Sequence, residues 1–150
     1  MKRILLTAVL FATFAVLTPG FAAAAQDTIG IVRNLAGEAT LTRGGEVVPA
    51  AVGMKLLVGD TLMTGANGSM GVILRDNSTL SIGPGSSLVV RNFLFAPAKG
   101  KFGLLVHLSR GTMAYLSGLI GKLAPESARF ETPVASIGIR GTRFAVKLDE

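Results

Sequence analysis

The 150-residue sequence contains no cysteine and no tryptophan, and it has a single histidine and a single tyrosine. Without cysteine the chain has no disulfide, no thiol nucleophile and no thiolate-ligated metal site. The single histidine, His107, cannot supply the several imidazoles of a zinc site, and its apolar neighbours favour a packed or surface role. We therefore expect no cofactor, no metal site and no enzymatic activity.

Motifs for nucleophilic catalysis, phosphate binding and nucleic-acid binding are also missing. No serine lies in a Gly-x-Ser-x-Gly elbow, so a hydrolase nucleophile of that type is not expected. The glycine-rich segment 83–87 lacks the lysine and the following helix of a phosphate-binding loop, which predicts a turn. One tyrosine and no tryptophan leave little surface for base stacking, so nucleic acid is not an expected partner.

The first 25 residues have the pattern of a cleaved export signal. The basic pair Lys2-Arg3 precedes an uncharged apolar run over residues 4–17, and Ala23 and Ala25 supply small residues before a cleavage site. The run is shorter than the roughly 20 residues needed to span a bilayer. Cleavage after Ala25 is therefore predicted in preference to the alternative, an uncleaved membrane anchor, and the chain is expected to be periplasmic or secreted.

The remainder, residues 26–150, has the length of one ordinary domain. Loss of Lys2 and Arg3 with the leader leaves 13 basic and 9 acidic side chains, so the predicted mature domain is only moderately basic. A domain of this size buries about two-thirds of its unfolded surface and needs no disulfide to be stable. Its stability is expected to come from packing and from backbone pairing.

Short runs of β-branched and apolar residues separated by turn residues predict an all-β fold with little or no helix. Gly44-Gly45 predicts a hairpin turn, and Asp76-Asn77 predicts another turn. Residues 91–101 are expected to form an inserted loop or ribbon, and 117–124 is the only plausible helical turn. Strands are expected over residues 28–32, 39–43, 46–48, 61–64, 70–74, 79–82, 87–90, 104–108, 112–116, 128–132, 134–139 and 143–148.

The stacking of these strands has two possible forms. Leu62, Val72, Leu80 and Val89 recur about every nine residues, as expected if each strand and its turn form one rung of a β-solenoid. A sandwich with tight turns would give a similar spacing, so the solenoid-like and sandwich-like alternatives both stay open.

Two separated motifs resemble the FecR domain family. The segment VGMKLLVGDTLMTGANGSMGVILRDNSTLSIGPGSSLVV (52–90) resembles the opening motif, and FETPVASIGIRGTRFAV (130–146) resembles the closing one. Asn77 stands where glycine is usual, and asparagine tolerates the left-handed backbone conformation. The matching positions are Gly59, Asp60, Thr64, Gly65, Asp76, Ser78, Thr132, Pro133, Gly141, Thr142 and Phe144.

We expect these motif residues to be mainly structural. Asp60 and Asp76 are short carboxylates next to turn residues, where they can accept hydrogen bonds from backbone N–H groups. Gly141 is expected at a tight backbone approach or a bulge. Some family members cut themselves at a Gly-Thr bond through attack of the threonine hydroxyl, and the resemblance makes Gly141-Thr142 a minor candidate for such a cleavage.

In well-known FecR-type signal transducers this domain is the periplasmic part, joined by a transmembrane helix to a cytoplasmic segment that regulates a sigma factor. Neither of those segments is evident in this sequence. The resemblance therefore implies a stand-alone exported binding module, with an envelope protein as the expected partner.

The alternative function is electrostatic association with cell-wall polymer or anionic lipid headgroups. For either function the candidate contact is the loop that contains Phe93, Phe95, Lys99 and Lys101. A purely structural role, in which the phenylalanines cover an open end of the β-stack, is the competing interpretation of that loop. The sequence leaves the oligomeric state open.

Overall fold

The computed structural model describes residues 26–149, so the predicted leader and its cleavage site lie outside the described residues. Twelve strands form one sheet. The strands are β1 (Gly30–Ala36), β2 (Ala39–Arg43), β3 (Glu46–Pro49), β4 (Lys55–Leu56), β5 (Thr61–Thr64), β6 (Ser69–Leu74), β7 (Thr79–Ile82), β8 (Ser87–Ala96), β9 (Lys101–Leu116), β10 (Ala128–Glu131), β11 (Ser136–Gly138) and β12 (Arg143–Leu148). One short α-helix, α1 (Leu119–Leu123), and two 3₁₀ turns, η1 (Pro97–Lys99) and η2 (Pro125–Ser127), complete the described elements.

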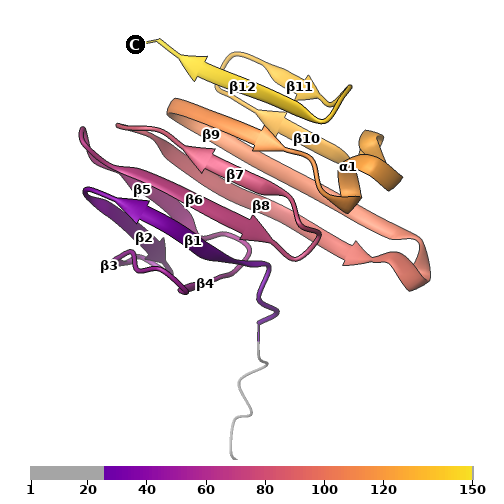
Figure 1. Cartoon of the computed structure of the whole chain (residues 1–150), viewed down its shortest axis with the longest axis horizontal. Coiled ribbons are helices and arrows are strands. Elements are labelled where there is room, and N and C mark those ends of the chain that lie inside the picture. The colour runs from indigo at the N-terminus through magenta and orange to yellow at the C-terminus, as the bar shows by residue number, and fades with distance from the viewer. Residues whose placement is uncertain (1–25, 150) are drawn as a thin grey trace, which may run out of the picture.

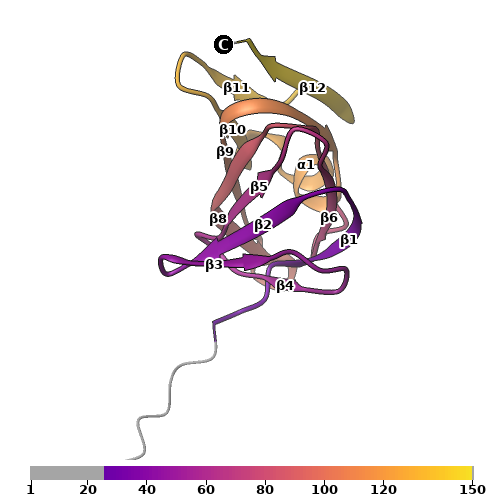
Figure 2. The same cartoon turned by 90° about the vertical axis from the view of Figure 1, so that its left-hand side faces the viewer.

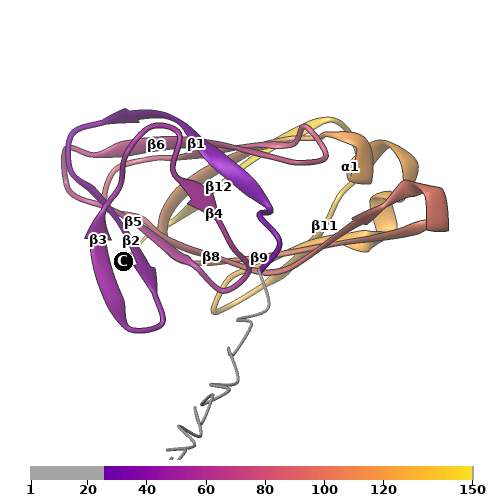
Figure 3. The same ribbon diagram turned by 90° about the horizontal axis from the view of Figure 1, so that it is seen from below.

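The sheet is curled into a half-barrel by β9, which runs through two wings (Figures 1 and 2). The first half of β9 pairs with β8 and β10, and the second half pairs with β7 and β12. One wing continues from β8 through β5 and β2 to β3, and the other continues from β7 through β6 and β1 to β4. Seen from below, the wings form two layers on either side of the core (Figure 3).

The bend in β9 is visible as a change in its burial pattern. Leu104, Val106 and Leu108 are buried, whereas the next inward side chains are Met113 and Tyr115, so the alternation changes phase between the two halves. A register irregularity lies opposite Ser87-Leu88 at the same point. Such a bulge bends a strand sharply, which allows one continuous strand to belong to both wings.

Cross-strand rows of apolar side chains build the core from both wings. The register aligns Leu41, Leu62, Leu88 and Leu108 across β2, β5, β8 and β9. On the facing wing it aligns Val32, Val72, Leu80, Tyr115 and Phe144 across β1, β6, β7, β9 and β12. All of these side chains except Phe144 are buried. Because directly opposed side chains share one face of a sheet, these two rows are the inner faces that the curled sheet closes.

The prediction of an all-β fold is confirmed, and the pairing decides between its two forms. Every strand pair is antiparallel except β9–β10, whereas the rungs of a β-solenoid stack in parallel. The solenoid-like alternative is therefore wrong, and the two facing wings are closer to the sandwich-like alternative. The nine-residue recurrence fails at its last residue, Val89. Leu88 and Val90 point toward the core in β8, and Val89 between them does not.

Two expectations for the middle of the chain differ from the structure, and a third is confirmed. Residues 91–101 do not form an inserted loop, because β8 continues to Ala96 and turns through η1 into β9, which gives the ribbon alternative. The two strands expected over 104–108 and 112–116 are one strand. The expected helical turn is present as α1. Within residues 26–149, no helix has the length and hydropathy required to cross a bilayer.

The bend in β9 provides a test of the fold. Gly111 lies at the bend with φ of +88°, and a Cβ atom there would collide with backbone and side-chain atoms of Ser86. Gly111→Ala should therefore lower the free energy of unfolding by about 2 to 4 kcal/mol in urea denaturation. Gly100→Ala is the control, because Gly100 has a similar φ of +63° but no atom near its Cβ position. Equal losses in the two variants would contradict the proposed close packing of the bend.

Candidate functional site

Asp76 is the centre of a buried polar cluster at the β6–β7 turn. Its Oδ1 accepts a hydrogen bond from the backbone N–H of Ser78 at 3.0 Å, and its Oδ2 accepts one from Ser78 Oγ at 2.6 Å. The backbone N–H of Ile120, at the start of α1, also donates to Oδ2 at 3.1 Å. The carboxylate therefore holds its own turn and joins that turn to a segment more than forty residues later. Asn77, at the tip, has φ of +65°, the left-handed conformation that asparagine tolerates.

The same cluster includes the only tyrosine of the chain. Tyr115 Oη lies 3.1 Å from Ser78 Oγ, and the backbone N–H of Gly118 donates to the same Ser78 Oγ at 3.1 Å. A Cβ atom at Gly118 would overlap backbone atoms of Asp76 and Ser78, so only glycine permits this approach. Burial raises the pKa of Tyr115, the hydrogen bond between its hydroxyl and that of Ser78 opposes that shift, and the nearby charge of Asp76 adds to it.

Asp60 forms a second polar cluster, next to β5. Arg43 donates to both carboxylate oxygens of Asp60, from Nε at 2.8 Å and from Nη2 at 2.6 Å. The backbone N–H of Leu57 donates to Oδ2 at 2.8 Å, and Arg43 also donates to the carbonyl of Lys55. The hydrogen bond with Asp60 raises the pKa of Arg43 above its ordinary value, so the guanidinium stays charged. The cluster ties β2 to the segment between β4 and β5.

Thr64 and Ser86 form a third cluster, where the two wings meet. Thr64 Oγ1 donates to the carbonyl of Gly83 at 2.6 Å and accepts from the backbone N–H of Ser86 at 2.9 Å. Ser86 Oγ accepts from the backbone N–H of Thr112 at 2.9 Å, directly after the bend in β9. Gly65 contributes backbone bonds to Glu38 and Gly85. These side chains satisfy backbone groups that the bend and the turn leave without strand partners.

The closing motif shapes the connections between the last strands. Thr132 organises the β10–β11 turn, since its Oγ1 accepts from the backbone N–H of Ala135 at 3.0 Å, and Pro133 lies exposed in that turn. Phe144 packs against Phe130 with ring centroids 4.6 Å apart and against Tyr115 at 5.6 Å. Gly141, with φ of +112°, and Thr142 lie exposed in the connection to β12. Gly141-Thr142 stays a minor candidate for self-cleavage.

Two separated parts of the chain thus have the same character, with polar motif residues that fix turns around one core. A family model described as FecR protein matches residues 60–150, which is more than half of the chain. The chain belongs to the FecR family. Searches among curated proteins and among solved structures gave no match. The FecR match begins at Asp60, so β1 to β4 precede it, although β1 pairs with β6 inside the matched region.

The predicted contact loop of this FecR domain is divided between core and surface. Phe93 is 8% exposed and lies beneath the guanidinium of Arg75, whose Cζ is 5.7 Å from the ring centroid. Phe95 packs across the hairpin against Phe102, with ring centroids 6.2 Å apart. Lys99 and Lys101 are exposed at the tip. The phenylalanines therefore stabilise the β8–β9 hairpin, and the two lysines are the part available to a partner.

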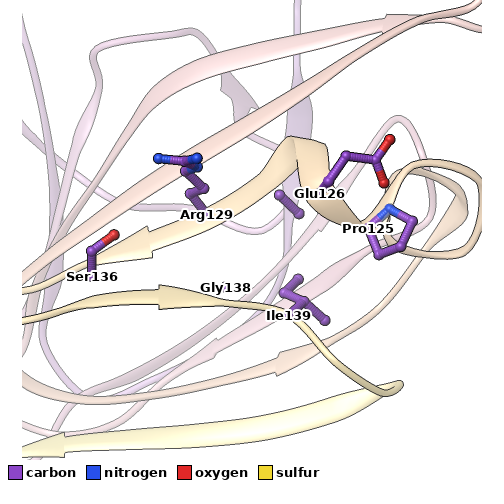
Figure 4. A pocket seen from close by; sticks show the side chains of 7 residues that line it. Pro125, Glu126, Arg129, Ser136, Gly138 and Ile139 are labelled. Atoms are coloured by element: carbon purple, nitrogen blue, oxygen red, sulfur yellow. The ribbon is translucent and has the colours of Figure 1, made fainter.

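An open groove of about 300 Å³ lies between η2, β10 and β11 (Figure 4). Pro125 and Glu126 border one end, and Arg129 and Ser136 border the other, so the polar groups do not converge on one point. Within residues 26–149, no group of three acidic, histidine or cysteine side chains could hold a metal ion.

His107 lies on β9 with its Nδ1 4.0 Å from Glu131 Oε2.

Asp60, Thr64, Asp76 and Ser78 were identifiable from the sequence, but their long-range partners were not. Arg43, Ser86 and Tyr115 complete the three clusters, and none belongs to the motif positions that carried the resemblance. The one available signal was Tyr115, because a lone tyrosine at an inward position of a strand has a hydroxyl that needs a buried partner. The separations of 17 to 44 residues between the bonded groups are not visible in a single sequence.

The Asp76 cluster predicts a large and specific loss of stability. Asp76→Asn removes the charge from a carboxylate that accepts three hydrogen bonds in a buried site. The free energy of unfolding should fall by about 2 to 4 kcal/mol, as measured by urea denaturation. Asp27→Asn, at an exposed position before β1, is the matched control and should change it by less than about 0.5 kcal/mol. A small loss at Asp76 would contradict its central role.

Tyr115 predicts a specific dependence of stability on alkaline pH. Because its folded pKa is raised above the unfolded value of 10.0, the unfolded chain loses the phenol proton first as pH rises. The stabilisation is therefore complete below pH 10 and is lost as pH rises through the folded pKa. Absorbance of the single tyrosine near 295 nm should titrate above pH 10, together with unfolding. An ordinary titration in a chain that remains folded would contradict this prediction.

Proposed function

We propose that this FecR-family chain is a non-catalytic binding module of the cell envelope that docks another envelope protein. The observation that carries the proposal is that the polar motif residues are engaged inside the fold. Asp60, Thr64, Asp76 and Ser78 are buried and hydrogen-bonded within the fold, so they act as structural supports. With these groups committed internally, recognition falls to the exposed sheet faces, strand edges and hairpin tip. This favours a binding function over an enzymatic one.

The tip of the β8–β9 hairpin is the contact surface that we assign to this function. The hairpin extends beyond the neighbouring strands (Figure 1) and presents Lys99 and Lys101 on either side of Gly100. Leu94 is 43% exposed on the same hairpin. An exposed aliphatic side chain beside two cations suits a protein surface that combines an apolar spot with acidic groups.

The same tip supports the alternative function, electrostatic association with anionic wall polymer or lipid headgroups. Two exposed lysines lie near an apolar side chain at this tip, and each lysine adds on the order of 1 kcal/mol to binding near a charged membrane. Electrostatic binding of this kind weakens when salt shortens the Debye length below about 8 Å. A packed protein interface persists under those conditions, so salt separates the two functions.

The test is an affinity pull-down of the tagged chain from lightly crosslinked envelope fractions, with low-salt and high-salt washes. We expect one discrete envelope protein to survive the high-salt wash with the unmodified chain. Lys99→Glu with Lys101→Glu should reduce its recovery at least tenfold, since the double change reverses the charge of the tip. Lys55→Glu with Lys122→Glu is the control, because these lysines are exposed elsewhere.

Recovery of only wall or lipid material that high salt removes would replace the protein-docking function with the electrostatic alternative. Equal recovery with both double variants would remove the hairpin tip from the contact surface. A separate experiment tests the expected export and cleavage after Ala25. The full chain is expressed with its predicted leader, the cells are fractionated, and the N-terminus of the recovered protein is sequenced.

A further inference from the structure

Strand β12 has one paired side and one open side. It pairs with β9 over the whole length from Arg143 to Leu148, in antiparallel register. No other described strand pairs with β12. In Figures 1 and 2 it lies at the outer margin of its wing, at the end of the sheet away from β4. An edge strand of this kind offers unpaired backbone groups to another strand.

The register identifies which backbone groups are free. The N–H of Ser117 donates to the carbonyl of Thr142 at 2.8 Å, and the pairing then continues without a shift along β12. Because antiparallel strands bond through alternate residues, Phe144, Val146 and Leu148 point their backbone groups at β9. The N–H and C=O groups of Arg143, Ala145 and Lys147 therefore face the open side.

The two faces of β12 differ sharply in character. Phe144, Val146 and Leu148 point toward the core but are only partly buried. Arg143, Ala145 and Lys147 are exposed on the outer face. Asp149 lies on this outer face as well, with its Oδ1 3.4 Å from Lys147 Nζ. A strand added to this edge would place one row of its side chains beside the apolar row of β12. Its other row would lie beside the charged side chains on the outer face.

These charges are self-complementary in one register. If two copies of β12 pair antiparallel about Val146, Arg143 of each copy lies opposite Asp149 of the other, and Ala145 lies opposite Lys147. Phe144 then faces Leu148 across the apolar side. Shifting the centre to Ala145 instead places Arg143 opposite Lys147, which opposes like charges and is destabilising. The Val146-centred register also joins residues whose backbone groups are free.

We propose that β12 is a dimerisation edge, at which two copies of this chain pair antiparallel about Val146. The wings that contain β12 in the two copies would then form one continuous sheet across a two-fold axis. Two-fold symmetry is the commonest symmetry of soluble oligomers. The intrachain Lys147–Asp149 pair does not prevent this exchange, because both side chains are more than 70% exposed and such pairs contribute little. This inference is independent of the hairpin tip and of the proposed docking function.

Sedimentation velocity of the purified chain, over about 5 to 500 μM, tests the association directly, since an edge of this size should dimerise weakly. Ala145→Pro removes an N–H that faces only the open side and should weaken dimerisation at least tenfold. Far-ultraviolet circular dichroism and thermal melting establish that this variant is folded. Arg140→Asp, just outside the paired register, should leave the association unchanged.

A charge exchange tests the register without removing any backbone hydrogen bond. Arg143→Asp and Asp149→Arg should each weaken dimerisation about tenfold, because each places like charges opposite one another across the axis. The double variant should restore it to within about threefold of the unmodified chain. A chain that stays monomeric over the whole range, a dimer that Ala145→Pro leaves intact, or a double variant that does not recover would overturn the proposal.

Discussion

The buried carboxylate of Asp76 is the interaction on which the packing of the β6–β7 turn against α1 and the end of β9 depends. It accepts hydrogen bonds from its own turn and from the first turn of α1, and Ser78 passes the contact on to Tyr115. The β6–β7 turn, the end of β9 and the start of α1 therefore meet at one polar point inside an apolar core. A buried charge is tolerated only when donors surround it, so this cluster specifies a single relative position for all three segments.

The three polar clusters give the polar motif residues a structural role. Each cluster satisfies backbone groups at a place where the strand ladder is interrupted: a turn, a bend or the gap between short strands. Thr64 and Ser86 act at the bend of β9, and Asp60 acts with Arg43 between β2 and β5. Their side chains are constrained by geometry as strictly as catalytic residues would be.

Local features of the fold could be predicted from the sequence, and long-range features could not. Turn chemistry located the β2–β3 and β6–β7 turns, and alternation located most strands, because both signals lie within a few neighbouring residues. The continuity of β9 was hidden, since the bulge near Ser109 shifts the phase of its alternation and imitates two strands. The parallel pairing of β9 with β10 was equally invisible, because it depends on the path of the intervening helix. The turn role of Asp76 followed from its neighbours, but its bond to Ile120 did not.

The shared strand β9 also determines how this protein can fold and unfold. It pairs with β7, β8, β10 and β12, so neither wing has its full set of neighbours until β9 is in place. Most of these pairings join residues far apart in the chain, which makes the search for the native topology slow. Once formed, the two wings share a backbone segment and cannot open separately without breaking it. The domain should therefore lose its structure in one cooperative step, with no stable half that survives alone.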